Sequence, residues 1–137
     1  MFRQFLVGGL ASVFNIAIHA LVMMAVIRVA QAIGAEYKRT HPSILVTAMA
    51  ATVSVLMAAH IAEVFVWALT YWLAGAVQPG AGLVYFAYVN YTTLGYGDVV
   101  PVREWHLLGP MTAMNGVLLF GWSTAVIFEV LRKTLGR

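Results

Sequence analysis

The chain has 137 residues, of which 62% are hydrophobic and 9% are charged, and its formal net charge is +3. Soluble domains carry about a quarter of their residues as charged side chains, so this composition excludes an ordinary soluble domain and indicates a membrane protein. The absence of cysteine excludes disulfides, thiolate chemistry and cysteine-based metal sites. The length favours one domain, and the basic residues sit mostly beside apolar runs, which suits membrane orientation better than nucleic-acid binding.

Three apolar runs are long enough to cross a bilayer as helices. They cover residues 5–27, 44–73 and 107–131. Because a helix rises 1.5 Å per residue, about 20 residues cross the hydrocarbon core. The sequence therefore predicts an all-α membrane protein with three spans.

The ends of the second run carry helix and membrane boundary signals. Pro42 suits the first turn of a helix, so this helix is expected to begin near it, after a polar connection at residues 31–43. Trp67, Tyr71 and Trp72 lie near its other end, where aromatic side chains are expected to form an interfacial belt. These signals place the two ends of the second span near the two membrane surfaces.

The lysines and arginines predict an orientation. In a three-span arrangement six of them lie on one side, namely Arg28, Lys38, Arg39, Arg132, Lys133 and Arg137. Arg3 and Arg103 lie on the other side. Cytoplasmic loops carry the excess of basic residues, so the amino terminus is expected outside and the carboxyl terminus in the cytoplasm.

A short aromatic segment and a glycine-rich stretch lie between the second and third runs. Residues 83–91 are apolar but too few to span, so a re-entrant helix fits, because non-spanning backbone is tolerated where protein or a water-filled cavity surrounds it. Residues 92–98 follow with the sequence Thr-Thr-Leu-Gly-Tyr-Gly-Asp. These residue types also suit a simple turn, although Gly95 and Gly97 admit backbone conformations that other residues avoid.

The stretch from Thr93 to Asp98 resembles the selectivity filter of potassium channels, whose signature is Thr-x-Gly-Tyr-Gly followed by Asp. From residue 44 onward the chain is similar to small bacterial members of the two-transmembrane ion-channel family. The resemblance implies a pore domain at 44–137 with an outer helix at 44–74, a pore helix at 82–92, a filter at 93–98 and an inner helix at 107–133. Residues 1–43 would add one amino-terminal helix and a cytoplasmic loop. One filter per chain implies a homotetramer.

The same resemblance assigns roles around the filter. Backbone carbonyls would replace the hydration water of K⁺, and they belong to Thr93, Leu94, Gly95, Tyr96 and Gly97. Asp98 would support the filter from behind, with Thr92 and Asn90 beside it. Leu94 stands where valine is commoner, and Asn90 stands where many potassium channels have threonine, so packing behind the filter is expected to differ.

The inner helix contains the candidate cavity and gate residues. Gly116 is either a gating hinge or a close-packing contact. Two alignments give two cavity-facing stripes, which are Leu118, Gly121 and Ala125 or, shifted by one position, Val117, Phe120 and Thr124. Glu129 either concentrates cations at the cytoplasmic mouth or pairs with Arg132 or Lys133.

Ionisable side chains also lie inside the expected membrane spans. His60 and Glu63 share one face of the second helix, and His19 lies in the first. Such groups are costly in a membrane and usually face protein or water. They are expected to form a buried hydrogen-bond network, with Asn115 or Asn90 as partners; a proton-sensing switch and a metal site are the alternatives.

Taken together, the sequence predicts a potassium-selective channel of a bacterial inner membrane. Its partners would be further copies of itself, the lipid bilayer and K⁺, with no cofactor, no nucleic acid and no enzymatic activity. A weakly selective cation channel and a non-conducting scaffold or accessory subunit are the alternatives. A membrane metalloenzyme built on His19, His60 and Glu63 is a further one.

Overall fold

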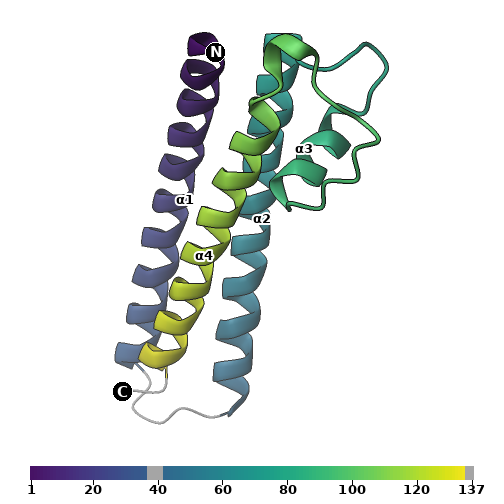
Figure 1. Cartoon of the computed structure of the whole chain (residues 1–137). Coiled ribbons are helices and arrows are strands. Elements are labelled where there is room, and N and C mark those ends of the chain that lie inside the picture. The colour runs from purple at the N-terminus through teal and green to yellow at the C-terminus, as the bar shows by residue number, and fades with distance from the viewer. Residues whose placement is uncertain (37–41, 135–137) are drawn as a thin grey trace.

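The computed structural model describes residues 1–36 and 42–134, and every regular element in these residues is helical. The elements are α1 (Phe2–Glu36), α2 (Pro42–Ala74), α3 (Leu83–Tyr91), the 3₁₀ helix η1 (Arg103–Trp105) and α4 (Leu108–Thr134). The prediction of an all-helical protein is confirmed (Figure 1).

The three long helices form a bundle in which each contacts the other two, and α2 runs antiparallel to α1 and α4 (Figure 1). Figure 1 shows the start of α1, the end of α2, α3 and the start of α4 toward one end of the bundle, with the end of α4 at the other. Three segments are long and apolar enough to cross a membrane, namely Phe2–Gln31, Leu45–Ala74 and Arg103–Lys133. The chain is therefore a multi-pass membrane protein.

The first helix is longer than its apolar run predicted. It continues to Glu36, so residues 31–36 are helical and the expectation that they belong to the polar connection is wrong. Alanine, glutamine and glutamate in this stretch are good helix formers, so the helix outlasts the membrane span. The rest of the expected connection, residues 37–41 with Lys38 and Arg39, lies outside the described residues.

The helices around residues 93–98, the expected filter, lie close to the expected boundaries. Pro42 opens α2, two residues before the expected outer helix, because proline fits the first helical turn. α3 is one residue shorter at each end than the expected pore helix. α4 begins and ends one residue later than the expected inner helix.

Two apolar clusters lie at different depths in the bundle. The first surrounds α3 and includes Val64, Trp67, Tyr71, Phe86, Ala87, Tyr91 and Leu108. The second lies toward the other end and consists of Met23, Val26, Ala30, Leu56, Val126 and Val130. Between the two, along all three long helices, are the buried polar residues Asn15, His19, His60, Glu63, Asn115 and Ser123. The polar layer therefore lies near the middle of the bundle.

The expected aromatic belt on α2 is wrong for two of its three members. Trp67 and Tyr71 are fully buried, whereas Trp72 is 64% exposed. The last turns of α2 pack against α3 and α4, so only one side of the helix is left for lipid. The polar atoms of the buried rings find partners inside the bundle, as buried indoles and phenols usually do: Trp67 donates to Asn115, and Tyr71 pairs with Thr112.

Candidate functional site

Residues 93–98, the segment expected to form the filter and called the filter below, are tied to the last turn of α3 through backbone hydrogen bonds. The Thr93 amide donates to the Asn90 carbonyl at 2.9 Å. The Leu94 and Gly95 amides both donate to the Val89 carbonyl, at 2.9 and 3.3 Å. These bonds end the regular hydrogen-bond pattern of the helix and fix the direction in which the chain leaves it. The end of α3 therefore determines where the filter begins.

The backbone of the filter alternates in handedness. Thr93, Gly95 and Gly97 have φ of 61°, 60° and 75°, while Leu94 and Tyr96 between them keep negative φ. A β-branched residue with positive φ is a genuine outlier, and outliers of this kind cluster at functional sites. Reversing the sign of φ at every second residue can turn successive carbonyls toward one side, whereas an ordinary strand alternates them.

Asp98, directly after the filter, is held by the pore helix. The Tyr85 hydroxyl donates to the Asp98 carboxylate at 2.7 Å, and this bond raises the pKa of the Tyr85 hydroxyl above its ordinary value. The Val102 amide donates to the Ala76 carbonyl at 2.9 Å, which ties the chain after the filter to the turn after α2. Both ends of the filter are therefore anchored to the same pore unit.

Thr92 and Asn90, expected to support the filter, hydrogen-bond back along the pore helix. Thr92 Oγ1 donates to the Tyr88 carbonyl at 2.8 Å, and Asn90 Nδ2 donates to the Phe86 carbonyl at 2.8 Å. Both bonds run back four residues along α3. In the single chain these side chains thus act on the filter through the helix that precedes it.

Gly116 is the point where α4 approaches α3 most tightly. A Cβ added here would lie 3.0 Å from the carbonyl carbon of Tyr91 and closer still to its oxygen. Small residues allow such approaches between membrane helices. Of the two roles expected for Gly116, the structure shows the close-packing contact.

The remaining candidate residues of α4 are arranged as follows. The residues of both expected cavity stripes are exposed in the single chain: Val117, Leu118, Phe120, Gly121, Thr124 and Ala125. Glu129 pairs with Arg132 at 2.8 Å and with Lys133 at 3.1 Å, so its carboxylate is engaged by its own helix. Both stripes therefore belong to one continuous exposed face of α4, and the exposure of the single chain fits either alignment.

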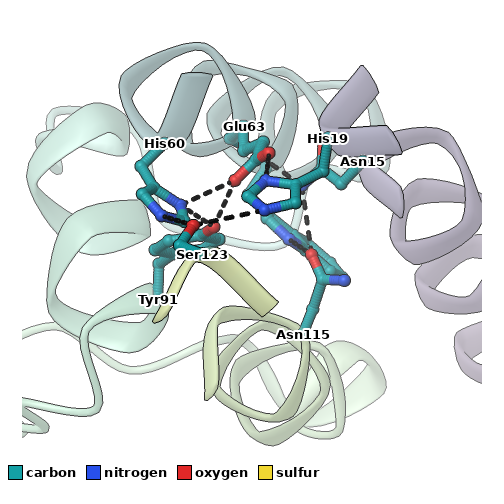
Figure 2. A network of polar contacts seen from close by, with 8 residues as sticks. Asn15, His19, His60, Glu63, Tyr91, Asn115 and Ser123 are labelled. Carbon is teal, nitrogen blue, oxygen red and sulfur yellow. Dashed lines mark hydrogen bonds and ion pairs between the residues drawn. The ribbon is translucent and has the colours of Figure 1, made fainter. Parts of the chain in front are cut away.

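The buried polar residues form one connected network at mid-depth (Figure 2). Glu63 lies at its centre: one carboxylate oxygen contacts His19 Nδ1 at 2.7 Å and the other contacts His60 Nδ1 at 2.9 Å. The Tyr91 hydroxyl also donates to Glu63. Ser123 Oγ lies 2.9 Å from His60 Nε2 and 3.2 Å from His19 Nε2. Residues from α1, α2, α3 and α4 are thus joined.

The expected partners of Glu63 and His60 are wrong in detail. Asn115 accepts from Asn15 at 3.1 Å and from Trp67 at 3.0 Å, and so joins the network one step away. Asn90 instead donates to the Phe86 carbonyl within α3, and its side chain lies beside Gly109 at the start of α4. The spacing of His60 and Glu63 along α2 shows that they share a face, but it does not show which neighbouring helix that face contacts.

Tyr91 and Ser123 are network residues without a predicted role, whereas Asn15 was expected only to share a helix face with His19. Tyr91 was only part of an aromatic run, and Ser123 was an isolated hydroxyl in an apolar helix. The available signal was that polar side chains inside spans usually face protein. Applied to each helix in turn, it selects Asn15 on α1 and Ser123 on α4.

The network also contains a cluster with the chemistry of a metal site. One ligand atom each from His19, His60 and Glu63 lies within 4.8 Å of the others. In the structure these atoms contact one another or Tyr91 and Ser123 at hydrogen-bond distance. The atoms that would hold a metal are therefore already partnered, and the hydrogen-bonded arrangement accounts for their positions.

Comparison with known proteins identifies the family of the segment that contains α2, α3 and α4. A family model described as an ion channel matches residues 44–133. The chain belongs to this ion channel family. The match begins at the start of α2 and ends at the end of α4, so it contains α3 and the filter but leaves α1 outside. No curated protein and no solved structure gives a significant match to the chain.

Membership of the family makes α2, α3 and α4 the ion-channel pore domain, and the prediction of a channel pore is confirmed. α1 is an additional helix that packs on this domain through α2 and α4. It brings His19 and Asn15 into the interior of the pore unit. The channel is therefore built from a family domain and a helix that completes its buried polar layer.

Proposed function

We propose that the protein is a potassium-selective channel in which four identical chains surround one pore. The observation that carries the proposal is the alternating backbone from Thr93 to Gly97, with positive φ at every second residue. Such a segment can present a row of carbonyl oxygens to one axis, where they replace the hydration shell of a K⁺ ion. Conduction of this kind is passive and needs neither a cofactor nor covalent chemistry.

The exposure of the filter supports assembly with further copies. Leu94 is 53% exposed and Tyr96 is 68% exposed. The apolar side chains of Met114, Val117 and Leu118 on α4 are also more than half exposed. Four copies related by a closed rotation would bury these side chains and bring four filter segments to one axis.

The proposed setting is the inner membrane of a bacterium, with the filter toward the outer half. Arg132 and Lys133 lie in the last turn of α4 and Arg28 lies in the second half of α1, whereas Arg3 lies near the start of α1. The start of α1 lies at the same end of the bundle as α3, and the end of α4 lies at the opposite end (Figure 1). An excess of basic residues marks the cytoplasmic side. The partners are then the lipid bilayer, K⁺ and three further copies of the chain.

The test is the flux of K⁺ and Na⁺ in proteoliposomes that contain the purified protein. Gly95→Ala puts a Cβ on a backbone with φ of 60° inside the filter, which should abolish K⁺-selective flux. Gly75→Ala is the matched control, because Gly75 also has φ of 60° and open space around it but lies in the turn after α2. It carries the same backbone strain away from the filter.

K⁺-selective flux in the wild type and in Gly75→Ala, lost in Gly95→Ala, is the expected result. Equal K⁺ and Na⁺ flux would replace the proposal with a weakly selective cation channel. If neither ion moved even when the preparation was shown to be tetrameric and folded, a non-conducting accessory subunit would become the better description.

A further inference from the structure

The central residues of the buried network form a closed ring of hydrogen bonds. Going around it, Glu63 contacts His19, His19 contacts Ser123, Ser123 contacts His60, and His60 returns to Glu63 (Figure 2). The four contacts measure 2.7, 3.2, 2.9 and 2.9 Å. Glu63 and His19 are fully buried, and His60 is 9% exposed. No contact of the ring is left to bulk water.

Each contact of the ring needs one hydrogen. A neutral imidazole carries one N–H, a hydroxyl carries one O–H, and an ionised carboxylate carries none. With ionised Glu63 and two neutral histidines, the ring holds three hydrogens for four contacts. Two lone pairs would then face each other at one contact, which is costly in a buried site.

One additional proton completes the ring. It can reside on either histidine as an imidazolium beside ionised Glu63, or on Glu63 with the two histidines neutral and protonated on opposite nitrogens. In each case every contact has a donor and an acceptor, and the ring is electrically neutral. Neutrality matters here, because a net charge at the middle of a membrane is costly.

Tyr91 connects the ring to the filter. Its hydroxyl supplies its own hydrogen to Glu63 and lies 2.9 Å from His60 Nδ1, so it adds no demand for a further proton. Tyr91 is also the last residue of α3, and its carbonyl packs against Gly116. A displacement of the Glu63 carboxylate therefore moves the end of the pore helix, to which the filter is bonded.

We propose that His19, His60, Glu63 and Ser123 form a binding site for a single proton, and that the filled site positions the filter through Tyr91. The first part rests on the ring geometry alone, and the second rests on the proposed channel function. The extra helix α1 then has a defined purpose, because it brings His19, one of the two imidazoles that share the proton.

The groups that face the ring from each packed element are few. α1 contributes His19, α2 contributes His60 and Glu63, and α3 contributes Tyr91. In the described part of α4, Ser123 contacts the ring. The ionisable Glu129 instead pairs with Arg132 and Lys133 near the end of the helix. No second carboxylate among the described residues competes for the proton.

Glu63→Gln replaces the carboxylate by an amide of nearly the same shape, which supplies the fourth hydrogen of the ring without an additional proton. The side-chain amide donates one hydrogen and accepts at its oxygen, so four contacts receive four hydrogens from glutamine, serine and two neutral histidines. The amide oxygen still accepts from Tyr91. The variant should keep the ring and the position of the filter but bind no extra proton.

The proton is counted by ¹⁵N NMR of histidine-labelled protein in lipid bilayers at neutral pH, with infrared detection of the Glu63 carboxylic acid. His41 and His106 are replaced by glutamine so that two histidines remain. The expected wild-type result is either one imidazolium with ionised Glu63, or protonated Glu63 with two neutral histidines. Two neutral histidines with ionised Glu63, or two imidazolium rings, would overturn the single-proton site. Glu63→Gln should show two neutral histidines.

The positioning role is measured as the ratio of K⁺ to Na⁺ flux. Tyr91→Phe keeps the ring shape but removes the link, and the ratio should fall by about tenfold, in line with one lost buried hydrogen bond. Tyr88→Phe removes a hydroxyl from the same helix outside the ring, and its ratio should stay within about twofold of wild type. An unchanged ratio in Tyr91→Phe would overturn the positioning role. If wild-type protein carries no K⁺, the channel proposal fails while the proton count is still measured.

Discussion

Gly116→Ala is expected to damage the channel at the contact between α4 and the pore helix. The new Cβ would lie 3.0 Å from the Tyr91 carbonyl carbon, 3.3 Å from its Cγ, and closer still to the carbonyl oxygen. Ordinary contacts of a Cβ begin at 3.4 Å. Because the nearest atom belongs to the backbone, no side-chain rotation relieves the clash, and α3 and α4 must separate.

Two opposing effects set the size of the loss. Replacing glycine by alanine inside a helix gains up to about 1 kcal/mol from helix propensity. Overpacking a tightly packed interior costs about 1–3 kcal/mol, and more where the backbone must move. The clash therefore outweighs the propensity, and the free energy of unfolding should fall by roughly 1–2 kcal/mol.

Equilibrium unfolding in mixed detergent micelles measures this free energy, and proteoliposome flux measures the effect on the filter. Gly9→Ala is the matched control, since Gly9 lies within α1 with open space where its Cβ would be. The control should be neutral or slightly stabilising. If Gly116→Ala were as stable as Gly9→Ala and kept the wild-type ratio of K⁺ to Na⁺ flux, the reasoning about this contact would be refuted.

Three smaller predictions concern single side-chain contacts. Trp67→Phe deletes the indole donor to Asn115 and should lower the free energy of unfolding by about 1 kcal/mol; an unchanged value would mean that this bond adds nothing. Glu129→Gln breaks only ion pairs of a kind that adds little, so micelle unfolding at physiological salt should match wild type, and a clear loss would contradict that view. Tyr85→Phe releases the Asp98 carboxylate and should lower the K⁺ to Na⁺ flux ratio. Since the raised pKa keeps the Tyr85 hydroxyl protonated, the wild-type ratio should hold up to about pH 10, and an earlier decline would argue against the role of this bond.

The helices and the pore domain were predictable because their signals are local. Apolar runs of spanning length gave the three long helices, and proline at residue 42 marked the start of α2. The short aromatic segment before the filter gave α3. These features depend on composition and chain length, which one sequence contains in full.

The partners within the buried network were not predictable, because they depend on how helices rotate against one another. Spacing put His60 and Glu63 on one face, but Tyr91 and Ser123 reach that face from other helices. Trp67 was misplaced for the same reason, since an aromatic residue near a span end faces lipid or protein according to its neighbours. Gly116 shows the same limit, because its contact is with the backbone of another helix.

Calorimetric titration of the purified protein with K⁺ and with Na⁺ tests, without needing an open gate, whether the stretch from Thr93 to Gly97 forms a K⁺-binding filter. We expect that K⁺ binds, that Na⁺ binds far more weakly, and that Gly95→Ala loses K⁺ binding while Gly75→Ala retains it. Equal binding of the two ions, or K⁺ binding that survives Gly95→Ala, would contradict it.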